Sequence, residues 1–535
     1  MSASPSPAAP TSTADEATAQ ALLAQDFGTI AALIRAHAQA APDSPALRDA
    51  RDVLTYAELD ALMDRVAAGL QRDGLKEGDA IAICAASSVQ YAAVFLGALR
   101  AGVAVAPLAP GSAPASLARM VQDAGAQLLF LDASTAPVLA GIAADGALRR
   151  IALDGNGDAA ATTTPLAAWL APAGTVPRAA HLAPASPFNI IYSSGTTGEP
   201  KGIVQGHGMR WAHVRRGAKY DYGRDTVTLL STPLYSNTTL VVFFPTIASG
   251  GCVVLMPKFD AGLYLQLAQQ HRVTHTMLVP VQYQRLMAHP QFDAFDLSSY
   301  RFKFSTSAPF NAALKADVLA RWPGGLVEFY GMTEGGGTCI LEAHLHPTKL
   351  HTVGPPAEGS DIRLIDDAGV EVPAGSAGEV VGHSAGMMTG YHGQPEKTRE
   401  AEWFDPSGKR FIRTGDVGRF DEDGFLTLFD RKKDMIISGG FNIYPSDLEA
   451  VLREHPAVAD MAVIGVPSEQ WGETPVGFVV RRPGHDASAA ALLQWVNERV
   501  GKTQRLAELR FIEELPRSAI GKVLKRELRE LHARA

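Results

Sequence analysis

Apolar positions in the first part of the chain switch between helical and strand spacing. A capping box formed by Thr55 and Glu58 opens a helix whose apolar residues recur every three or four positions as far as Gly74. Strands are then predicted at residues 80–85, 103–106 and 127–131, with helices at 91–99 and 117–124 between them. This alternation predicts βαβ units and a mostly parallel sheet.

The alternation resumes beyond a loop-rich connection at residues 155–187. Further strands are predicted at 188–191, 227–230, 276–279, 302–305 and 326–329. No charged residue occurs between Asp225 and Lys258, but prolines and glycines interrupt this stretch. We therefore expect a buried helix and a buried strand there, and no membrane insertion.

The pattern changes in the last third of the chain. Short strands separated by Gly, Pro and Asp at residues 362–430 predict antiparallel hairpins or a small barrel. The compact tail that follows has strands at 460–466, 476–480 and 509–512, a helix at 489–500, and a helix capped by Ser446 with Glu449 in capping-box spacing. Its size, roughly a hundred residues, is that of a separate small domain.

The predicted fold class is therefore α/β. A large N-terminal domain of parallel sheets flanked by helices, with a small β-barrel-like part, occupies residues 26–430, and a small α+β domain occupies 435–535. We place the boundary between them at 431–434. Residues 1–25, rich in Ala, Ser, Pro and Thr, are expected to form a disordered tail and lack the positive n-region of a secretory signal.

Composition narrows the functional classes. A chain of 535 residues is too long for one core. The net charge of −8 gives no basic footprint, so no nucleic-acid partner is expected. Cys84, Cys252 and Cys339 are few and far apart, which suits buried thiols in a reducing compartment, the cytoplasm, rather than disulfides or a cysteine metal site.

A phosphate-binding loop is the clearest chemical feature. The stretch Tyr192–Gly202 places Ser193, Ser194, Gly195, Thr196, Thr197, Gly198 and Lys201 directly after an apolar strand. Glycines let backbone N–H groups approach phosphate oxygens, hydroxyls add donors, and the lysine adds positive charge. The Gly-Lys-Ser/Thr ending of a P-loop is absent, so this is a different phosphate loop; an ordinary Ser/Thr/Gly turn is the alternative.

Four more clusters carry candidate chemistry, and each has a plainer alternative as a surface turn or solvated charge. Glu334 in Tyr330-Gly331-Met332-Thr333-Glu334 suits Mg²⁺, which prefers one or two carboxylates plus substrate phosphates. Asp416 suits ribose hydroxyls. The charged run 431–434 and Lys522, on a loop before the last helix, complete the set.

Together these five motifs, in this order, resemble the adenylate-forming superfamily, most closely its AMP-forming acyl-CoA synthetases, from about Phe27 to the C-terminus. The resemblance implies a small mobile C-terminal domain with the active site between the two domains. It also implies that Ser194, Thr196 and Lys201 handle ATP phosphates, Tyr330 stacks on adenine, Thr333 contacts the α-phosphate, Glu334 holds Mg²⁺, Asp416 and Arg431 bind ribose, Lys522 promotes adenylation, and Lys433 is the hinge. His207 matches a family histidine near the acyl carboxylate, or is a structural histidine.

The reaction implied is ATP-dependent activation of a small-molecule carboxylic acid to an acyl-adenylate, followed by transfer to coenzyme A with release of AMP and pyrophosphate. An acyl-AMP ligase that loads a separate carrier protein, and a non-enzymatic ATP-binding relative, are the alternatives. Tyr235-Ser236 and Ser305–Pro309 depart from the family pattern. Three glycines at 335–337 should leave room in the acyl pocket, which favours a medium- or long-chain fatty acid or an aromatic acid over acetate.

Overall fold

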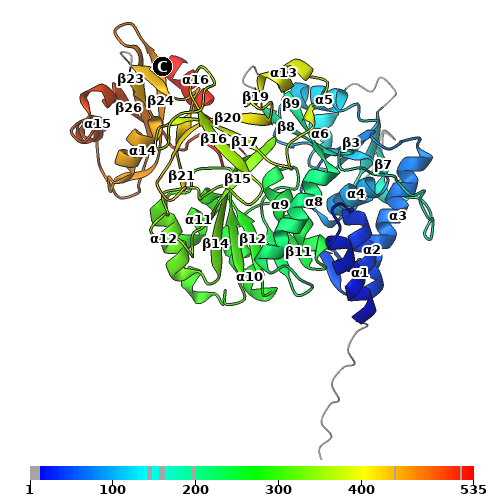
Figure 1. The fold of residues 1–535 in the computed structure, drawn as a ribbon. Helices are drawn as coiled ribbons and strands as arrows, with labels where there is room; N and C mark the ends of the chain where they lie inside the picture. The colour runs from blue at the N-terminus through cyan, green and yellow to red at the C-terminus, as the bar shows by residue number, and fades with distance from the viewer. Residues whose placement is uncertain are drawn as a thin grey trace, which may run out of the picture.

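The computed structural model describes residues 13–140, 142, 148–155, 163–194, 200–438, 441–518 and 521–534, without the side chains of 13–17, 194, 441, 442 and 503. Two eight-stranded sheets form its larger part (Figure 1). In order across the sheet, the first contains β15 (Gly335–Glu342), β14 (Gly325–Met332), β13 (Phe302–Ser305), β12 (His275–Leu278), β10 (Val227–Leu230), β11 (Cys252–Leu255), β1 (Pro45–Arg48) and β2 (Val53–Thr55). Only its two edge pairs are antiparallel, so the predicted parallel sheet is confirmed here.

The second sheet has the order β18 (Gly390–Tyr391), β9 (Pro200–Gly206), β8 (Pro187–Ser194), β4 (Ala104–Pro107), β3 (Ala80–Cys84), β5 (Leu128–Leu131), β6 (Arg149–Ala152) and β7 (Thr163–Pro165). Its strands from β8 to β7 are parallel, whereas β8, β9 and β18 pair antiparallel. The predicted phosphate loop begins in β8 and ends in β9, and its residues 195–199 lie outside the described residues. Most predicted strands of this region are observed within one or two residues.

Helices between the two sheets form the main core. They are α2 (Ile30–Ala40), α3 (Tyr56–Arg72), α4 (Val89–Arg100), α8 (His207–Gly217) and α9 (Asn237–Ala248). The outer face of the first sheet is covered by α10 (Ala261–Gln270), α11 (Pro280–Met287) and α12 (Ala312–Arg321), and that of the second by α5 (Pro114–Asp123) and α6 (Ala136–Leu139). The remaining short helix of this part is α7 (Leu166–Trp169).

Helix α3 begins as its sequence requires. Thr55 accepts a hydrogen bond from the Glu58 N–H at 3.2 Å, and Glu58 accepts one from the Thr55 N–H at 2.8 Å, so the predicted capping box is confirmed. The uncharged stretch 226–257 folds into β10, α9 and β11, all largely buried. Among the described helices, none is long and apolar enough to cross a membrane.

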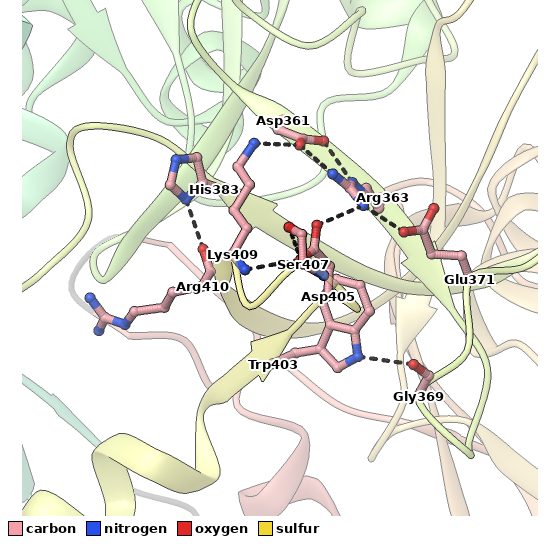
Figure 2. Close-up of polar contacts among 10 residues, drawn as sticks. All are labelled: Asp361, Arg363, Gly369, Glu371, His383, Trp403, Asp405, Ser407, Lys409 and Arg410. Carbon is pink, nitrogen blue, oxygen red and sulfur yellow. Dashed lines mark hydrogen bonds and ion pairs between the residues drawn. The ribbon is translucent and has the colours of Figure 1, made fainter.

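A five-stranded antiparallel sheet follows, in the order β16 (Asp361–Ile365), β17 (Gly378–His383), β20 (Arg410–Phe420) and β19 (Glu402–Phe404), with β21 (Leu426–Arg431) on β20 and α13 (Pro395–Glu400) beside it. An ion-pair cluster fixes its outer part (Figure 2). Arg363 bonds Asp361 at 2.8 Å and Glu371 at 2.6 Å, and Lys409 reaches Asp361 at 2.7 Å. Through Arg363, the pKa of Asp361 falls to about 2. Lys409 of this cluster immediately precedes β20, the strand that contains Asp416.

The last part forms its own sheet, β23 (Phe441–Ile443), β22 (Ile436–Ser438), β25 (Gly472–Arg481), β24 (Val458–Ser468) and β26 (Glu508–Phe511), covered by α14 (Pro445–Arg453), α15 (Ala489–Asn497) and α16 (Lys525–Arg534). In Figure 1 these orange and red elements stand beside the antiparallel sheet. One hydrophobic cluster lies under α14 and α15, and another lies under α16. The C-terminal part therefore has hydrophobic clusters of its own, as a small domain does.

Two local predictions are wrong. Part of the expected tail 1–25 is helix α1 (Thr13–Leu23), since an alanine-rich segment forms a helix readily and buries Ala19 in the main core. Ser446 does not cap α14. The cap is Tyr444, because Pro445 is favoured at the first helical position, and the Ser446 N–H donates instead to Asp430 at 2.8 Å.

Candidate active site

A large cavity, about 1790 Å³, lies between the N-terminal part and the small C-terminal part of the chain. It is lined from both sides: by the β8–β9 hairpin, helices α8 and α9, the β14–β15 turn and the β20–β21 hairpin, and by the loop that precedes α16. Residues from all five predicted motifs therefore meet in one place, although the first and the last motif are more than three hundred positions apart in the sequence.

Asp416 and Arg431 lie on one side of this cavity, and Tyr330 contacts Asp416 without being part of the lining. The Tyr330 hydroxyl donates to Asp416 Oδ2 at 2.8 Å, and Arg431 Nε lies 3.3 Å from Asp416 Oδ1. Asp416 and Arg431 are opposite each other in the β20–β21 ladder, which sets their spacing. Burial, with the Asp416 charge, raises the pKa of Tyr330, so its hydroxyl stays protonated and can donate. The strand pairing thus assembles a carboxylate with donors on both sides of it.

Glu334 occupies the turn between β14 and β15. The hydroxyl of Tyr391 donates to Glu334 Oε1 at 2.9 Å, and Lys201 Nζ lies 5.1 Å from the centroid of the Tyr391 ring. Burial, with the Glu334 charge, raises the pKa of Tyr391 well above its usual range. Tyr391 therefore links the lysine of the phosphate loop to the candidate metal carboxylate. The sequence did not single out Tyr391, because only the pairing of β18 with β9 brings it here.

A buried polar network supports Thr333. Gln205 Nε2 donates to the Thr333 carbonyl at 2.6 Å, and Asn189 Nδ2 donates to Gln205 Oε1 at 3.0 Å. Arg210 donates to both Asn189 Oδ1, at 3.1 Å, and Gln205 Oε1. Burial lowers the pKa of Arg210 to about 9. Asn189, Gln205 and Arg210 are fully buried, and their role was not visible in the sequence because isolated polar residues in apolar segments carry no pattern.

Lys522 reaches the cavity from the C-terminal part. Its loop is closed by the Ser518 N–H, which donates to the Lys522 carbonyl at 2.8 Å, and by Arg517, which donates to the Gly521 carbonyl at 2.6 Å. Gly521 has φ +75°, and a Cβ there would lie 2.6 Å from Val281 of α11, so glycine is needed where the loop meets the N-terminal part. Burial, helped by the Arg431 charge, lowers the pKa of Lys522 to about 8.

Lys433 lies between the end of β21 and the start of β22 and also lines the cavity. Burial, with the neighbouring Arg431 charge, lowers the pKa of its ammonium group. On either side, Lys432 pairs with Asp367 at 2.6 Å and Asp434 with Arg529 of α16 at 2.9 Å. The connection between the two parts is thus short and held on both sides by ion pairs.

Comparison with known proteins agrees with this arrangement. The family model described as AMP-binding enzyme matches residues 34–392, and that of the AMP-binding enzyme C-terminal domain matches residues 447–522. The chain belongs to the AMP-binding enzymes. It is thereby a member of the adenylate-forming acyl-CoA synthetase superfamily whose motifs it carries.

Similar proteins cover nearly the whole chain. A feruloyl-CoA synthase of an Amycolatopsis species is 35% identical over 500 residues, 92% of this chain and 96% of that protein. The fatty acid–[acyl-carrier-protein] ligase ScoC of Streptomyces coeruleorubidus is 31% identical over 504 residues, 92% of this chain and 94% of that protein. The ATP-bound structure of MatB from Rhodopseudomonas palustris superposes with a TM-score of 0.84 at 30% identity, over 94% of this chain and 99% of that one.

The predicted phosphate loop of this AMP-binding enzyme is described only at its two ends. Ser193 in β8 and Lys201 in β9 pair with each other and line the cavity, as does Gly331 of β14. Gly195, Thr196, Thr197, Gly198 and the side chain of Ser194 lie outside the described residues. Their assignment to ATP phosphates stays a prediction.

His207 is placed away from the cavity wall. It begins α8 with 4% of its surface exposed, its ring meets Phe188 edge-on with centroids 4.9 Å apart, and Nε2 is buried without a partner among the described residues. Burial lowers the pKa of His207 to about 4, so the ring is neutral. This geometry favours a structural histidine over a group that contacts the acyl carboxylate.

The three glycines after Glu334 do not enlarge the acyl pocket, so that expectation is wrong. Added Cβ atoms at Gly335, Gly336 and Gly337 would lie 2.1 Å from the Gly386 carbonyl, 2.9 Å from Ile412 and 2.6 Å from Ile362, respectively. All three have positive φ. The glycines serve instead to bring β15 close against the antiparallel sheet.

Two departures from the family pattern have a structural account. Ser236 caps α9, its Oγ accepting from the Thr238 N–H at 3.3 Å, and it lines the cavity next to Tyr235. Ser307 adopts φ +78°, a conformation that suits glycine, and its Oγ lies 2.6 Å from Thr238 Oγ1. That hydrogen bond joins the loop after β13 to the start of α9 and offsets part of the backbone strain.

Proposed function

We propose that this protein is an AMP-forming acid–CoA ligase: it activates a carboxylic acid with ATP and transfers the acyl group to CoA. The observation that carries the proposal is the presence of Lys522 in the same cavity as Glu334 and Asp416. A cation supplied by a separate domain, opposite a nucleotide site, is suited to stabilising charge that develops during adenylation.

In the proposed first half-reaction, the substrate carboxylate attacks the α-phosphorus of ATP in line and pyrophosphate leaves. Lys522 stabilises the charge that builds on the α-phosphoryl oxygens, and Thr333 contacts the same phosphoryl group. Asp416 accepts from the ribose hydroxyls with Arg431 beside it, and Tyr330 and Gly331 flank the adenine. Lys201 and the phosphate loop orient the leaving pyrophosphate.

Glu334 is suited to hold Mg²⁺ together with the ATP phosphates. Its Oε1 accepts from Tyr391, and its Oε2 has no partner within the described part of the chain. Mg²⁺ is commonly bound by one or two carboxylates plus substrate phosphates, and a single available carboxylate oxygen on the cavity wall fits that pattern. When bound, Mg²⁺ would neutralise phosphate charge; Glu334, held by Tyr391, would orient it.

The second half-reaction needs a thiol to reach the acyl carbonyl, where Lys522 stands during adenylation. Rotation of residues 435–535 about a hinge at 431–434, centred on Lys433, would withdraw Lys522. CoA is favoured as the acceptor by the feruloyl-CoA synthase relative, and a carrier protein, as printed for ScoC, is the second candidate. A cytoplasmic location is supported by three buried free cysteines.

An aromatic acid is favoured by the wall of the part of the cavity that lies between α8 and α9, which we call the inner cavity. Tyr220, Tyr222, Phe304 and Phe329 line it, and Tyr220 meets Phe304 and Phe329 edge-on at 5.2 and 6.0 Å. Flat apolar surfaces of this kind pack well against an aryl ring. The name of the feruloyl-CoA synthase relative points to the same class.

The test is a panel of acids with ATP, Mg²⁺ and CoA, assayed for pyrophosphate, AMP and thioester. We expect aryl acids or octanoate to be used far better than acetate, and a chelator to abolish the reaction. Replacing CoA by a phosphopantetheinyl carrier protein tests the second acceptor. Failure of every acid to support ATP–pyrophosphate exchange would refute the proposed function, and thioester formation on the carrier alone would refute CoA as acceptor.

A further inference from the structure

The inner cavity runs between two helices of the core. On α8, the lining residues Met209, Ala212, His213, Arg216 and Gly217 recur at helical spacing, so one face of the helix forms the wall. The facing wall is α9, from Asn237 to Pro245. Met209 lies next to Gly386, and Gly386 lies against Gly335, so this end of α8 is the end near Glu334. Gly217 lies against Pro245 and Tyr222 at the opposite end.

Arg216 brings a positive charge to this far end. It is partly buried, and its guanidinium makes no hydrogen bond or ion pair with any other residue that the structure describes. Its neighbours supply no negative charge. Burial, with the charges of Arg210 and Arg216, lowers the pKa of His213, so this ring is neutral, and Arg210 is held by neutral amides. A desolvated cation without a counter-charge is unfavourable unless a ligand supplies one.

Tyr220 adds a second unsatisfied group. Only 2% of the residue is exposed, and its hydroxyl is buried and without a partner among the described residues. Burial raises the pKa of Tyr220, so the hydroxyl stays protonated, and it lies near enough to Arg216 to interact with it electrostatically. The Glu342 carboxylate, which contributes to raising the pKa of Tyr220, is itself paired with Lys219 at 2.9 Å. The Tyr220 hydroxyl and the Arg216 guanidinium are thus two hydrogen-bond donors without acceptors at one end of the cavity. Together they can bind an oxygen atom of a ligand that accepts hydrogen bonds.

We infer that the inner cavity recognises an aromatic acid bearing an oxygen acceptor at its distal end, which Arg216 binds and Tyr220 supports. This inference rests on the proposed acid–CoA ligase function and narrows its substrate class. A plain fatty acid would place an alkyl tail against Arg216 and leave the guanidinium desolvated and unpaired. The acceptor can be a phenolic oxygen or a second carboxylate, since the guanidinium donates to both.

The distance along the cavity suits a ring joined to the carboxyl by a short linker. Met209 and Arg216 are seven residues apart on α8, which corresponds to about 10 Å at 1.5 Å per residue. The reacting carboxylate belongs near the Met209 end, next to the Glu334 turn, and the acceptor near the Arg216 end. Arg216 therefore acts as a specificity-determining residue rather than a catalytic one.

The test compares three acids: 3-phenylpropenoate, its 4-hydroxy derivative and its 4-carboxy derivative. For the wild type, we expect kcat/KM to be roughly 10–100-fold higher for at least one oxygen-bearing acid than for the unsubstituted acid, as for loss of a hydrogen bond to a charged group. Whether the hydroxy or the carboxy acid is preferred identifies the acceptor. Arg216→Met should bring that ratio close to one, and Tyr220→Phe should lower it by a smaller factor.

Arg215→Met is the matched control. Arg215 is the preceding residue of α8, but it is exposed and does not line the cavity, so this variant should keep the wild-type ratio. Wild-type preference for the unsubstituted acid, or an unchanged ratio in Arg216→Met, would overturn the inference. If a melting curve shows that Arg216→Met does not fold, the wild-type ratio and Tyr220→Phe decide.

The inference and the proposed function fail in different ways. Acid-dependent pyrophosphate exchange with octanoate but with none of the three aryl acids would overturn the inference and leave the ligase function standing. Absence of exchange with every acid would remove the ligase function itself.

Discussion

Lys522 is the residue whose removal should separate the two half-reactions. It lines the cavity from the C-terminal part, next to Arg431, Lys433 and Asp416. If it stabilises the α-phosphoryl charge, Lys522→Ala should nearly abolish adenylate formation. It should spare thioester formation from supplied acyl-adenylate, because Lys522 has left the site by that step.

The magnitude follows from the electrostatics of the site. Burial and nearby cations lower the pKa of Lys522 from 10.5 to about 8. At about 1.4 kcal/mol per pH unit, burial and the nearby cations disfavour the charged lysine by roughly 3 kcal/mol. Phosphate oxygens of ATP would supply the missing counter-charge, so the lysine is available to stabilise the transition state. Loss of one such preorganised contact costs on the order of 10²–10³ in rate, which is the decrease expected for adenylation.

The same pKa fixes the sign of the pH dependence. Because the pKa is lowered, Lys522 of the free enzyme is mostly charged at pH 7, half charged near pH 8 and mostly neutral at pH 9. The wild-type kcat/KM for ATP in adenylation should therefore fall above about pH 8, by roughly tenfold per pH unit. Bound phosphate favours the charged form of Lys522, so the alkaline decrease in kcat should occur at a higher pH than the decrease in kcat/KM. Lys522→Ala should lack this alkaline decrease.

The assays are acid-dependent ATP–pyrophosphate exchange for the first step and thioester formation from synthetic acyl-adenylate and CoA for the second. Lys502→Ala, an exposed lysine of the same small domain, is the matched control and should behave as the wild type in both. Equal losses in the two half-reactions, or an alkaline decrease that persists in Lys522→Ala, would refute the role given to Lys522.

Three further predictions concern the hinge, the phosphate loop and the Glu334 side chain. Lys433→Pro should leave adenylation near the wild-type rate and block thioesterification, because the linker can no longer rotate; full turnover to the thioester would contradict the hinge assignment. Lys201→Ala should raise the KM for ATP roughly tenfold without changing the ranking of acids, measured across the acid panel, and an altered ranking would count against a pure phosphate role. Tyr391→Phe removes the hydroxyl that donates to Glu334 at 2.9 Å and should raise the Mg²⁺ concentration needed for half-maximal exchange by roughly 3–10-fold; an unchanged Mg²⁺ titration would show that Tyr391 does not orient Glu334.

The sequence predicted the local structure well where periodicity was strong. The capping box of α3 and the buried strands β3, β10 and β13 are observed as expected, because apolar spacing and helix caps are properties of adjacent residues. Predictions at chain ends and caps were weaker. Helix α1 was missed because its stability depends on packing Ala19 into a core made by distant segments.

The candidate site shows the same division. Lys201, Glu334, Asp416 and Lys522 could be named from motifs, because each occurs in a short stretch with an unusual composition. Tyr391, Gln205 and Arg216 could not, because single polar or aromatic residues in otherwise ordinary segments acquire a role only through their neighbours in space. The glycines at 335–337 were misread for this reason: their missing side chains face Gly386, Ile412 of β20 and Ile362 of β16, which the sequence does not reveal.

By itself, therefore, the sequence determined the α/β class, the order of the domains, the adenylate-forming family and the residue types of the chemistry. Tertiary structure alone decided which of those residues meet, that Lys522 enters the shared cavity from the C-terminal part, and that Arg216 has no counter-charge among the described residues at the end of the inner cavity. The physical reason is the distance along the chain over which each effect acts. Propensity and periodicity act over a few neighbouring residues, whereas charge balance, burial and hydrogen-bond satisfaction depend on contacts between segments hundreds of residues apart.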